Sequence, residues 1–200
     1  MRIPEDGEIR ALHERWAPGR EAFELVWTHC VIVCEIAEQI MAGAGAGAGL
    51  DAGLVRAGCL LHDVGVYRLY GPAGRLDHSQ YVRHGVLGHE LLAGEGFPEE
   101  ICRFCSRHTG MGLTRDDIER EGLPVPPGDY VAESGEERIV MYADKFHSKT
   151  NPPTFVSAET YAVHVRRFGA EKGAVFAAMR EVYGEPDLEP LAERYGHALV

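Results

Sequence analysis

Apolar side chains recur along most of the chain at intervals of three and four residues, the spacing of one face of an α-helix. We predict helices over residues 5–16, 20–41, 51–63 and 78–94, from Pro98 to His108, after Thr114, from about Glu133 to Lys149, and over 157–180 and 187–196. No segment alternates apolar and polar residues as a half-buried β-strand would. The pattern therefore predicts an all-α fold.

Capping residues and glycines predict where several of these helices begin and end. Asp51 stands where its side chain can cap the following helix, and Gly65 stands where a glycine often ends one. Thr114 and Asp117 have the spacing of a capping box. Gly and Ala alternate over residues 43–49 without a following Gly-Lys-Ser/Thr, so we interpret this segment as a flexible linker rather than a phosphate-binding loop.

The overall composition is that of a globular protein, with 200 residues, 45% hydrophobic and 26% charged. A net charge of −11 argues against non-specific binding to nucleic acids, which requires a surface rich in Lys and Arg. It still allows a small anionic substrate that a local metal cluster could hold.

The N-terminal residues 1–6 contain no apolar signal core, and we see no 18-residue apolar run, so no membrane association is expected. Five cysteines are an odd number in a chain without a secretory signal. We therefore expect free thiols and a cytoplasmic location.

His62 and Asp63 lie side by side within the apolar run of residues 60–65. Burying both without partners would cost several kcal/mol, and a metal ion satisfies imidazole and carboxylate together. Four further candidate ligands each fall on a different predicted helix, near its end or on its core-facing side: His29, His84, His108 and Asp144. Their wide separations do not suit a local zinc knuckle, but they suit a helical bundle that collects ligands in a central pocket.

Five short motifs at these positions resemble the HD-domain metal-dependent phosphohydrolase superfamily, and more narrowly its HDIG-type members. They are Thr28-His29, Leu61-His62-Asp63-Val64-Gly65, His84-Gly85-Val86-Leu87-Gly88, Arg107-His108-Thr109-Gly110 and Tyr142-Ala143-Asp144-Lys145, in the order and approximate spacing of that family. The resemblance implies an HD-domain helical bundle over residues 1–150. Residues 151–200 would then be a C-terminal helical extension packed on the same domain.

The resemblance also implies a site with two divalent metal ions. The implied ligands are His29, His62, Asp63 and Asp144 for the first ion, and His84 and His108 for the second, with Asp63 bridging. These side chains suit Fe, Mn, Mg, Ni or Zn, and the sequence does not choose among them. Two such ions would polarise a phosphoryl oxygen and lower the pKa of a water molecule that attacks phosphorus. Catalytic roles would fall to His62, Asp63 and Lys145.

Basic residues near the ligands in the sequence are candidates for contacts with substrate phosphates. They are Arg68, Arg75, Arg83 and Lys145. Many HDIG-type members have Lys where Val66 stands here. His147 follows Asp144 by three residues on the same predicted helical face and is a further candidate for substrate binding. His13, His164 and His197 have no role in this interpretation.

Three functions follow from these residues. The first is hydrolysis of a phosphate ester or anhydride of a nucleotide or similar small molecule. The second is the mixed-valence di-iron oxygenase branch of the same superfamily, which reuses the six ligands for oxygen chemistry. The third is a non-catalytic module that senses a nucleotide. A homo-oligomer is compatible with each.

A competing zinc site would use Cys102, Cys105 and His108. Because no second Cys/His pair lies at a suitable spacing, we interpret the two cysteines as small core residues.

Overall fold

The computed structural model describes residues 2–43 and 47–200. The α-helices in these residues are α1 (Asp6–Trp16), α2 (Arg20–Ala42), α3 (Ala52–Leu61), α4 (His84–Gly94), α5 (Glu99–Ser106), α6 (Arg115–Glu121), α7 (Gly135–Ala143), α8 (Ala158–Val165), α9 (Ala170–Tyr183) and α10 (Glu189–Tyr195). Short 3-10 helices are η1 (Val64–Leu69), η2 (His78–Arg83), η3 (Asp144–Phe146) and η4 (Arg166–Phe168). Residues 44–46, the middle of the predicted Gly/Ala linker, lie outside the described residues.

The predicted all-α class is confirmed, and the described residues also form a very small sheet. Its strands β1 (His147–Ser148), β2 (Thr154–Phe155) and β3 (Ala198–Leu199) are two residues long. β1 pairs with β2 antiparallel, and β2 pairs with β3 in parallel. Strands this short show no alternation of apolar and polar positions, which is why the sequence pattern does not reveal them.

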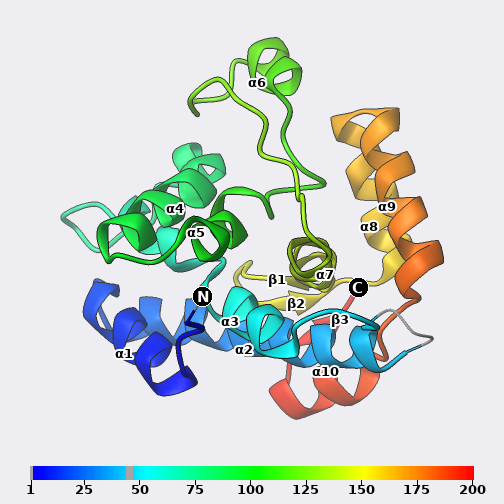
Figure 1. The fold of residues 1–200 in the computed structure, drawn as a ribbon, viewed down its shortest axis with the longest axis horizontal. Helices are drawn as coiled ribbons and strands as arrows, with labels where there is room; N and C mark the ends of the chain where they lie inside the picture. The colour runs from blue at the N-terminus through cyan, green and yellow to red at the C-terminus, as the bar shows by residue number, and fades with distance from the viewer. Residues whose placement is uncertain (1, 44–46) are drawn as a thin grey trace.

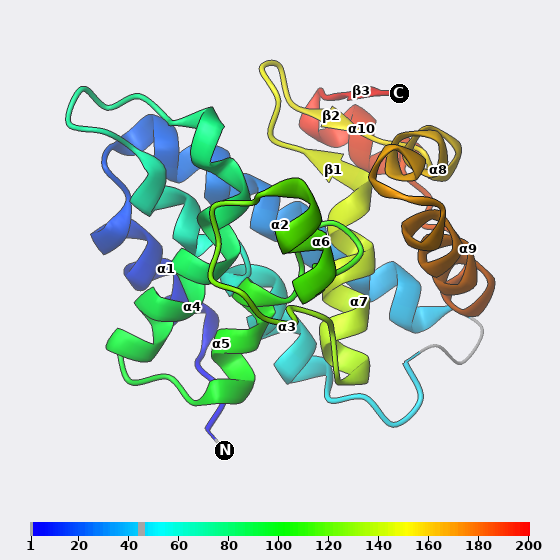
Figure 2. The same cartoon turned by 90° about the horizontal axis from the view of Figure 1, so that it is seen from above.

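α2 packs against α3 and α7; it lies along the lower side of the molecule in Figure 1 and near the middle of the view in Figure 2. In Figure 2, α1, α4 and α5 lie on one side of α2, and α7, α8 and α9 lie on the other. α6 lies over the middle in the same view. The residues that come together at the centre therefore belong to segments far apart in the sequence.

α2 is, by length and composition, apolar enough to cross a membrane. The expectation that no such apolar stretch exists therefore needs correction. Half of its apolar window is buried inside the protein, where α2 packs against α3 and α7. The apolar residues of α2 thus form part of the core, and the absence of membrane association stays a prediction.

Two predicted helix caps are present in the structure. The Asp51 side chain accepts a hydrogen bond from the backbone N–H of Leu54. Thr114 and Asp117 form the expected capping box at the start of α6. These side chains satisfy N–H groups that have no partner within the helix.

Four predicted helices are shorter than the apolar spacing suggests. The segment 157–180 divides into α8, η4 and α9, with a break at Gly169. The segment 78–94 divides into η2 and α4 at His84, and α5 ends at Ser106 rather than near His108. The helix predicted to reach Lys149 ends at Ala143. His147 is therefore in strand β1 and does not share a helical face with Asp144.

Gly65 does not end a helix as predicted, because it lies inside η1. Its role is close packing against α4: an added Cβ would stand 2.0 Å from the carbonyl oxygen of His84 and 2.3 Å from the backbone nitrogen of Gly88. A Cβ on Gly88 would in turn stand 2.9 Å from the sulfur of Cys105 in α5. The two glycines thus let α4 approach the segment that carries Asp63.

Residues 151–200 pack on the rest of the chain through apolar and polar contacts. Phe155 and Phe176 belong to the same buried cluster as the residues of α2 and α3. The hydroxyl of Tyr142 in α7 donates to the carbonyl of Gly184 at 2.7 Å. The division into a domain at 1–150 and an extension at 151–200 stays a prediction.

Candidate metal centre

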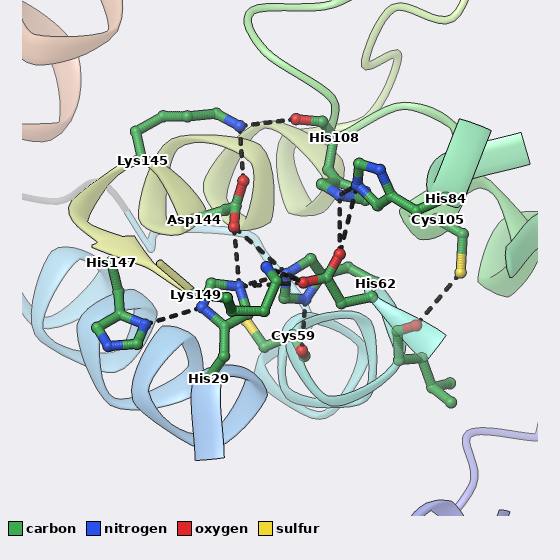
Figure 3. Close-up of polar contacts among 12 residues, drawn as sticks. His29, Cys59, His62, His84, Cys105, His108, Asp144, Lys145, His147 and Lys149 are labelled. Carbon is green, nitrogen blue, oxygen red and sulfur yellow. Dashed lines mark hydrogen bonds and ion pairs between the residues drawn. The ribbon is translucent and has the colours of Figure 1, made fainter. Parts of the chain in front are cut away.

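The structure brings the six predicted ligands together at the centre of the helices (Figure 3). His29 comes from the middle of α2, and the others stand at element ends: His62 and Asp63 after α3, His84 at the start of α4, His108 after α5, and Asp144 after α7. All four histidines and Asp63 are buried. Helix ends suit this purpose because the chain can turn a side chain inward there.

Four of these side chains form one group of ligand atoms. His29 Nε2 lies 3.0 Å from Asp144 Oδ1, 3.2 Å from His62 Nε2 and 3.3 Å from Asp63 Oδ2. His62 Nε2 lies 3.4 Å from the same oxygen of Asp144 and 3.6 Å from the same oxygen of Asp63. Ligand atoms about 2.1 Å from one ion stand roughly 3.0 to 3.4 Å apart at right or tetrahedral angles. The spacing therefore fits a divalent ion.

The second group uses the other oxygen of Asp63. His84 Nε2 and His108 Nε2 are 2.9 Å apart, and they lie 3.4 Å and 3.5 Å from Asp63 Oδ1. Both oxygens of Asp63 are fully buried and have no regular hydrogen bond among the described residues, although the ammonium group of Lys149 forms an ion pair with Oδ2. Buried carboxylate oxygens normally have partners. Two cations, one facing each oxygen, would supply them.

The histidines are oriented so that Nε2 faces the centre. His62, His84 and His108 each direct Nδ1 at a backbone carbonyl, those of Cys59 at 2.7 Å, Tyr81 at 2.6 Å and Phe104 at 3.0 Å. A ring that donates from Nδ1–H has its lone pair on Nε2, which is the form that binds a metal.

The end of α3 shows how the local sequence holds His62 in place. The last carbonyls of a helix have no partner within it. Two of the last carbonyls of α3 accept hydrogen bonds from His62: that of Gly58 from the backbone N–H and that of Cys59 from the imidazole ring. The next two accept from other segments: the carbonyl of Leu60 from Nε2 of His13, and that of Leu61 from the thiol of Cys105. Cys105 is therefore a buried thiol that supports the helix end.

Charge in the centre matches the needs of a metal site. Burial lowers the pKa of His29 to about 4 and the pKa of His84 to about 3, so both rings are neutral near pH 7. Burial alone would raise the pKa of Asp63, but Lys149 and His62 outweigh it and hold this pKa well below its usual value. Neutral imidazoles and ionised carboxylates are the forms that bind divalent ions. His62 is the exception among these rings: burial alone would lower its pKa, but the carboxylate of Asp63 outweighs it and holds this pKa above its usual value, so His62 must release a proton before it binds an ion.

Two lysines stand beside the ligands. Lys145 donates to Asp144 Oδ2 at 2.7 Å and to the carbonyl of His108 at 2.8 Å. Lys149, which sequence reasoning did not identify, forms an ion pair with Asp63 Oδ2. Lys149 follows His147 by two residues, so a strand prediction for this segment would have placed both side chains on one face.

A cavity of about 750 Å³ opens onto the ligands. Its wall includes Asp63, His84, His108 and Asp144 together with Lys145, His147 and Lys149, and extends to Tyr161 and Phe168. His164, to which we gave no role, and His78 also line it. Arg68 and Arg75 are exposed, and neither they nor Arg83 are among its lining residues. Contacts of these arginines with substrate stay a prediction.

A family model of the HD domain matches residues 26–149. The chain belongs to the HD-domain family. The predicted membership is thus confirmed, and the His and Asp residues that meet in this HD domain indicate binding of divalent metal.

Two relatives match part of this chain in sequence. An uncharacterized protein of Methanocaldococcus jannaschii, MJ0778, is 38% identical over 60% of this chain and 65% of its own length. A tRNA (cytidine(56)-2'-O)-methyltransferase of Picrophilus torridus is 38% identical over 49% of this chain and 25% of its own length. The match therefore spans less than two thirds of either relative.

The solved HD domain of the L. monocytogenes phosphodiesterase PgpH has the same fold. Its TM-score is 0.51 at 16% sequence identity, and the alignment covers 94% of this chain and 98% of that domain. In complex with cyclic-di-AMP, the same domain gives a TM-score of 0.50 at 15% identity, over 90% and 99% of the two chains. At these identities the likeness shows the fold alone.

Proposed function

We propose that this HD domain is a metal-dependent phosphohydrolase that cleaves a phosphate ester of a nucleotide or similar small molecule. The observation that carries the proposal is Asp63, whose two buried oxygens face two separate sets of imidazoles. Two bound divalent ions would polarise a phosphoryl oxygen and lower the pKa of the attacking water. The number and identity of the ions belong to the proposal.

The chain's own residues would bind and orient the phosphate. Lys145 and Lys149 line the cavity beside the carboxylates of Asp144 and Asp63. Once those carboxylates bind cations, the two ammonium groups are free to form charge-assisted hydrogen bonds with phosphate oxygens. Lys145 is in this way a substrate contact and a group that can stabilise developing negative charge.

The rest of the cavity favours a substrate with one phosphoryl group and an uncharged ring. Lys172 also lines the wall, but Asp117 in α6 neutralises it. Tyr161, Phe168 and several aliphatic residues form much of the remaining surface. Further phosphates would meet no unpaired lysine or arginine among the described residues of this wall, whereas aromatic side chains can stack on a base. A nucleoside monophosphate has this chemistry.

The cyclic-di-AMP complex of the PgpH domain supports a nucleotide substrate. The buried state of all five free cysteines is consistent with a reducing, cytoplasmic location, which we retain as part of the proposal. Assembly into a homo-oligomer stays a prediction.

The proposal is tested by phosphate release from nucleoside monophosphates, triphosphates, dinucleoside polyphosphates and cyclic-di-AMP, with Mg²⁺, Mn²⁺, Co²⁺, Ni²⁺ and Fe²⁺ in turn. We expect monophosphates to be hydrolysed with several of these ions. Asp63→Asn should lose the activity, and the exposed Asp187→Asn should retain it.

Two results would contradict the proposal in distinguishable ways. Two bound irons with oxygen consumption and no phosphate release would identify the di-iron oxygenase branch. Tight nucleotide binding without turnover under any ion would identify a sensing module.

A further inference from the structure

Three histidines form a continuous hydrogen-bonded chain that begins at the metal centre. His29 Nδ1 lies 2.9 Å from His147 Nδ1, and His147 Nε2 lies 3.0 Å from His197 Nδ1. The rings are stacked in both pairs, with centroids 5.2 Å apart. Figure 3 shows His147 on the side of His29 away from the other ligands. The other three ligand histidines, His62, His84 and His108, differ from His29 because their Nδ1 atoms face backbone carbonyls.

A backbone carbonyl can only accept, so it holds the hydrogen of its histidine on Nδ1. The imidazole of His147 can accept or donate, so His29 has two consistent arrangements. In the first, His29 donates from Nδ1–H to His147, which donates from Nε2–H to His197. In the second, every hydrogen lies on the other nitrogen, and His29 donates from Nε2–H to Asp144, 3.0 Å away. Only the first arrangement gives His29 an Nε2 lone pair for a metal ion.

We propose that His147 and His197 are positioning residues that hold the hydrogen of His29 on Nδ1 when the metal centre is loaded. His147 accepts that hydrogen, and His197 accepts from the opposite nitrogen of His147. Without His197, the buried Nε2–H of His147 would lose its partner and the first arrangement would be disfavoured.

The hydrogen bonds from His29 to His147 and from His147 to His197 also link the C-terminal segment to the metal centre. His197 lies directly before β3, which pairs with β2, and the rings of Phe155 and Tyr195 lie 6.0 Å from its own. His147 is in β1 and contacts Phe155 edge-on. The small sheet thus fixes the positions of both rings relative to α2, which carries His29.

The inference rests on the proposed metal centre, and its test measures metal affinity and histidine hydrogen bonding rather than turnover. Metal-free protein is titrated with Mn²⁺, and the free ion is measured by electron paramagnetic resonance. His147→Leu should bind the His29-side ion 10- to 100-fold more weakly, the range usual when a hydrogen bond to a ligand is lost. His197→Phe keeps a stacked ring and should weaken binding by a smaller factor.

Two further variants separate positioning from folding. In His147→Asn, the side-chain oxygen takes the place of Nδ1 as acceptor, so most of the lost affinity should return. His89→Phe is the matched control, because His89 bonds to Ser106 Oγ and is not a ligand. It should bind Mn²⁺ as the wild type does, and thermal unfolding followed by circular dichroism checks that each variant is folded.

A spectroscopic readout tests the hydrogen position directly. In Zn²⁺-loaded protein with ¹⁵N-labelled histidine, the His29 Nδ1–H should show a nitrogen–nitrogen coupling to His147 across the hydrogen bond. The coupling should vanish in His147→Leu. Folded His147→Leu and His197→Phe with wild-type Mn²⁺ affinity would overturn this inference alone. A wild-type protein that binds no divalent ion would overturn the proposed function as well.

Discussion

The ammonium group of Lys149 forms an ion pair with Oδ2 of Asp63, the same oxygen that faces His29 and His62. The Asp63 side chain is fully buried, and that of Lys149 is 12% exposed. When one partner of such a pair is removed, the other charge stays buried without compensation. In the metal-free protein, Lys149 therefore provides positive charge where a divalent ion would otherwise do so.

Lys149→Gln should lower the free energy of unfolding of the metal-free protein by about 3 kcal/mol, because Asp63 then loses its charged partner. A divalent ion that binds only the folded state should recover most of this loss. Urea unfolding with and without Mn²⁺ measures both effects.

Lys172→Gln is the matched control for this prediction. It breaks another buried ion pair, that with Asp117, which includes none of the six ligands. Mn²⁺ should raise the free energy of unfolding of Lys172→Gln by no more than it raises that of the wild type. Equal recovery in the two variants would contradict the assignment of Lys149 to the metal centre.

Gly65→Ala should destabilise the protein by about 3 kcal/mol, because its Cβ would overlap the backbone of His84 and Gly88. The displacement of α4 should also weaken binding of the ion on the His84 side. Gly94→Ala is the control, since Gly94 ends α4 with no atom within 4 Å of an added Cβ. Gly94→Ala should leave stability unchanged or raise it by up to about 1 kcal/mol. Similar unfolding midpoints for the two variants would contradict the packing role of Gly65.

His13 should make the protein less stable in acid. Burial lowers its pKa to about 4, while an unfolded histidine titrates near 6.5. Between these values the unfolded chain binds the proton and the folded chain does not, so the free energy of unfolding falls as the pH is lowered. The full loss is about 3 kcal/mol and is complete below both pKa values.

His13→Gln isolates this contribution, because glutamine does not titrate. The stability difference between wild type and His13→Gln should shrink as the pH falls from 7 to 4. A difference that stays constant over this range would mean that His13 is protonated equally in the folded and unfolded states. Urea unfolding at each pH provides the comparison.

The sequence was sufficient to find the six side chains that meet at the centre, because each lies in a short motif and near the end of an apolar-periodic segment. It did not reveal that α7 ends at Ala143, since residues 144–149 contain no helix-breaking residue. Lys149 and the strand position of His147 were missed for that reason.

His197 and Gly65 illustrate a second limit of the sequence. His197 lies 50 positions from His147, and their contact depends on the pairing of two-residue strands that leave no pattern. Gly65 matches the signal for a helix end, yet the structure requires a glycine there because α4 approaches it closely. Both the contact of His197 with His147 and the need for glycine at position 65 arise from tertiary packing, which a local sequence pattern does not show.

The most direct test of the central claim is the metal content of purified protein loaded with a single divalent ion and measured by elemental analysis. The account predicts about two ions per chain in the wild type, about one in His84→Ala, and almost none in Asp63→Ala, because Asp63 faces both groups of ligands. The same metal content in all three proteins would contradict a bridging role for Asp63.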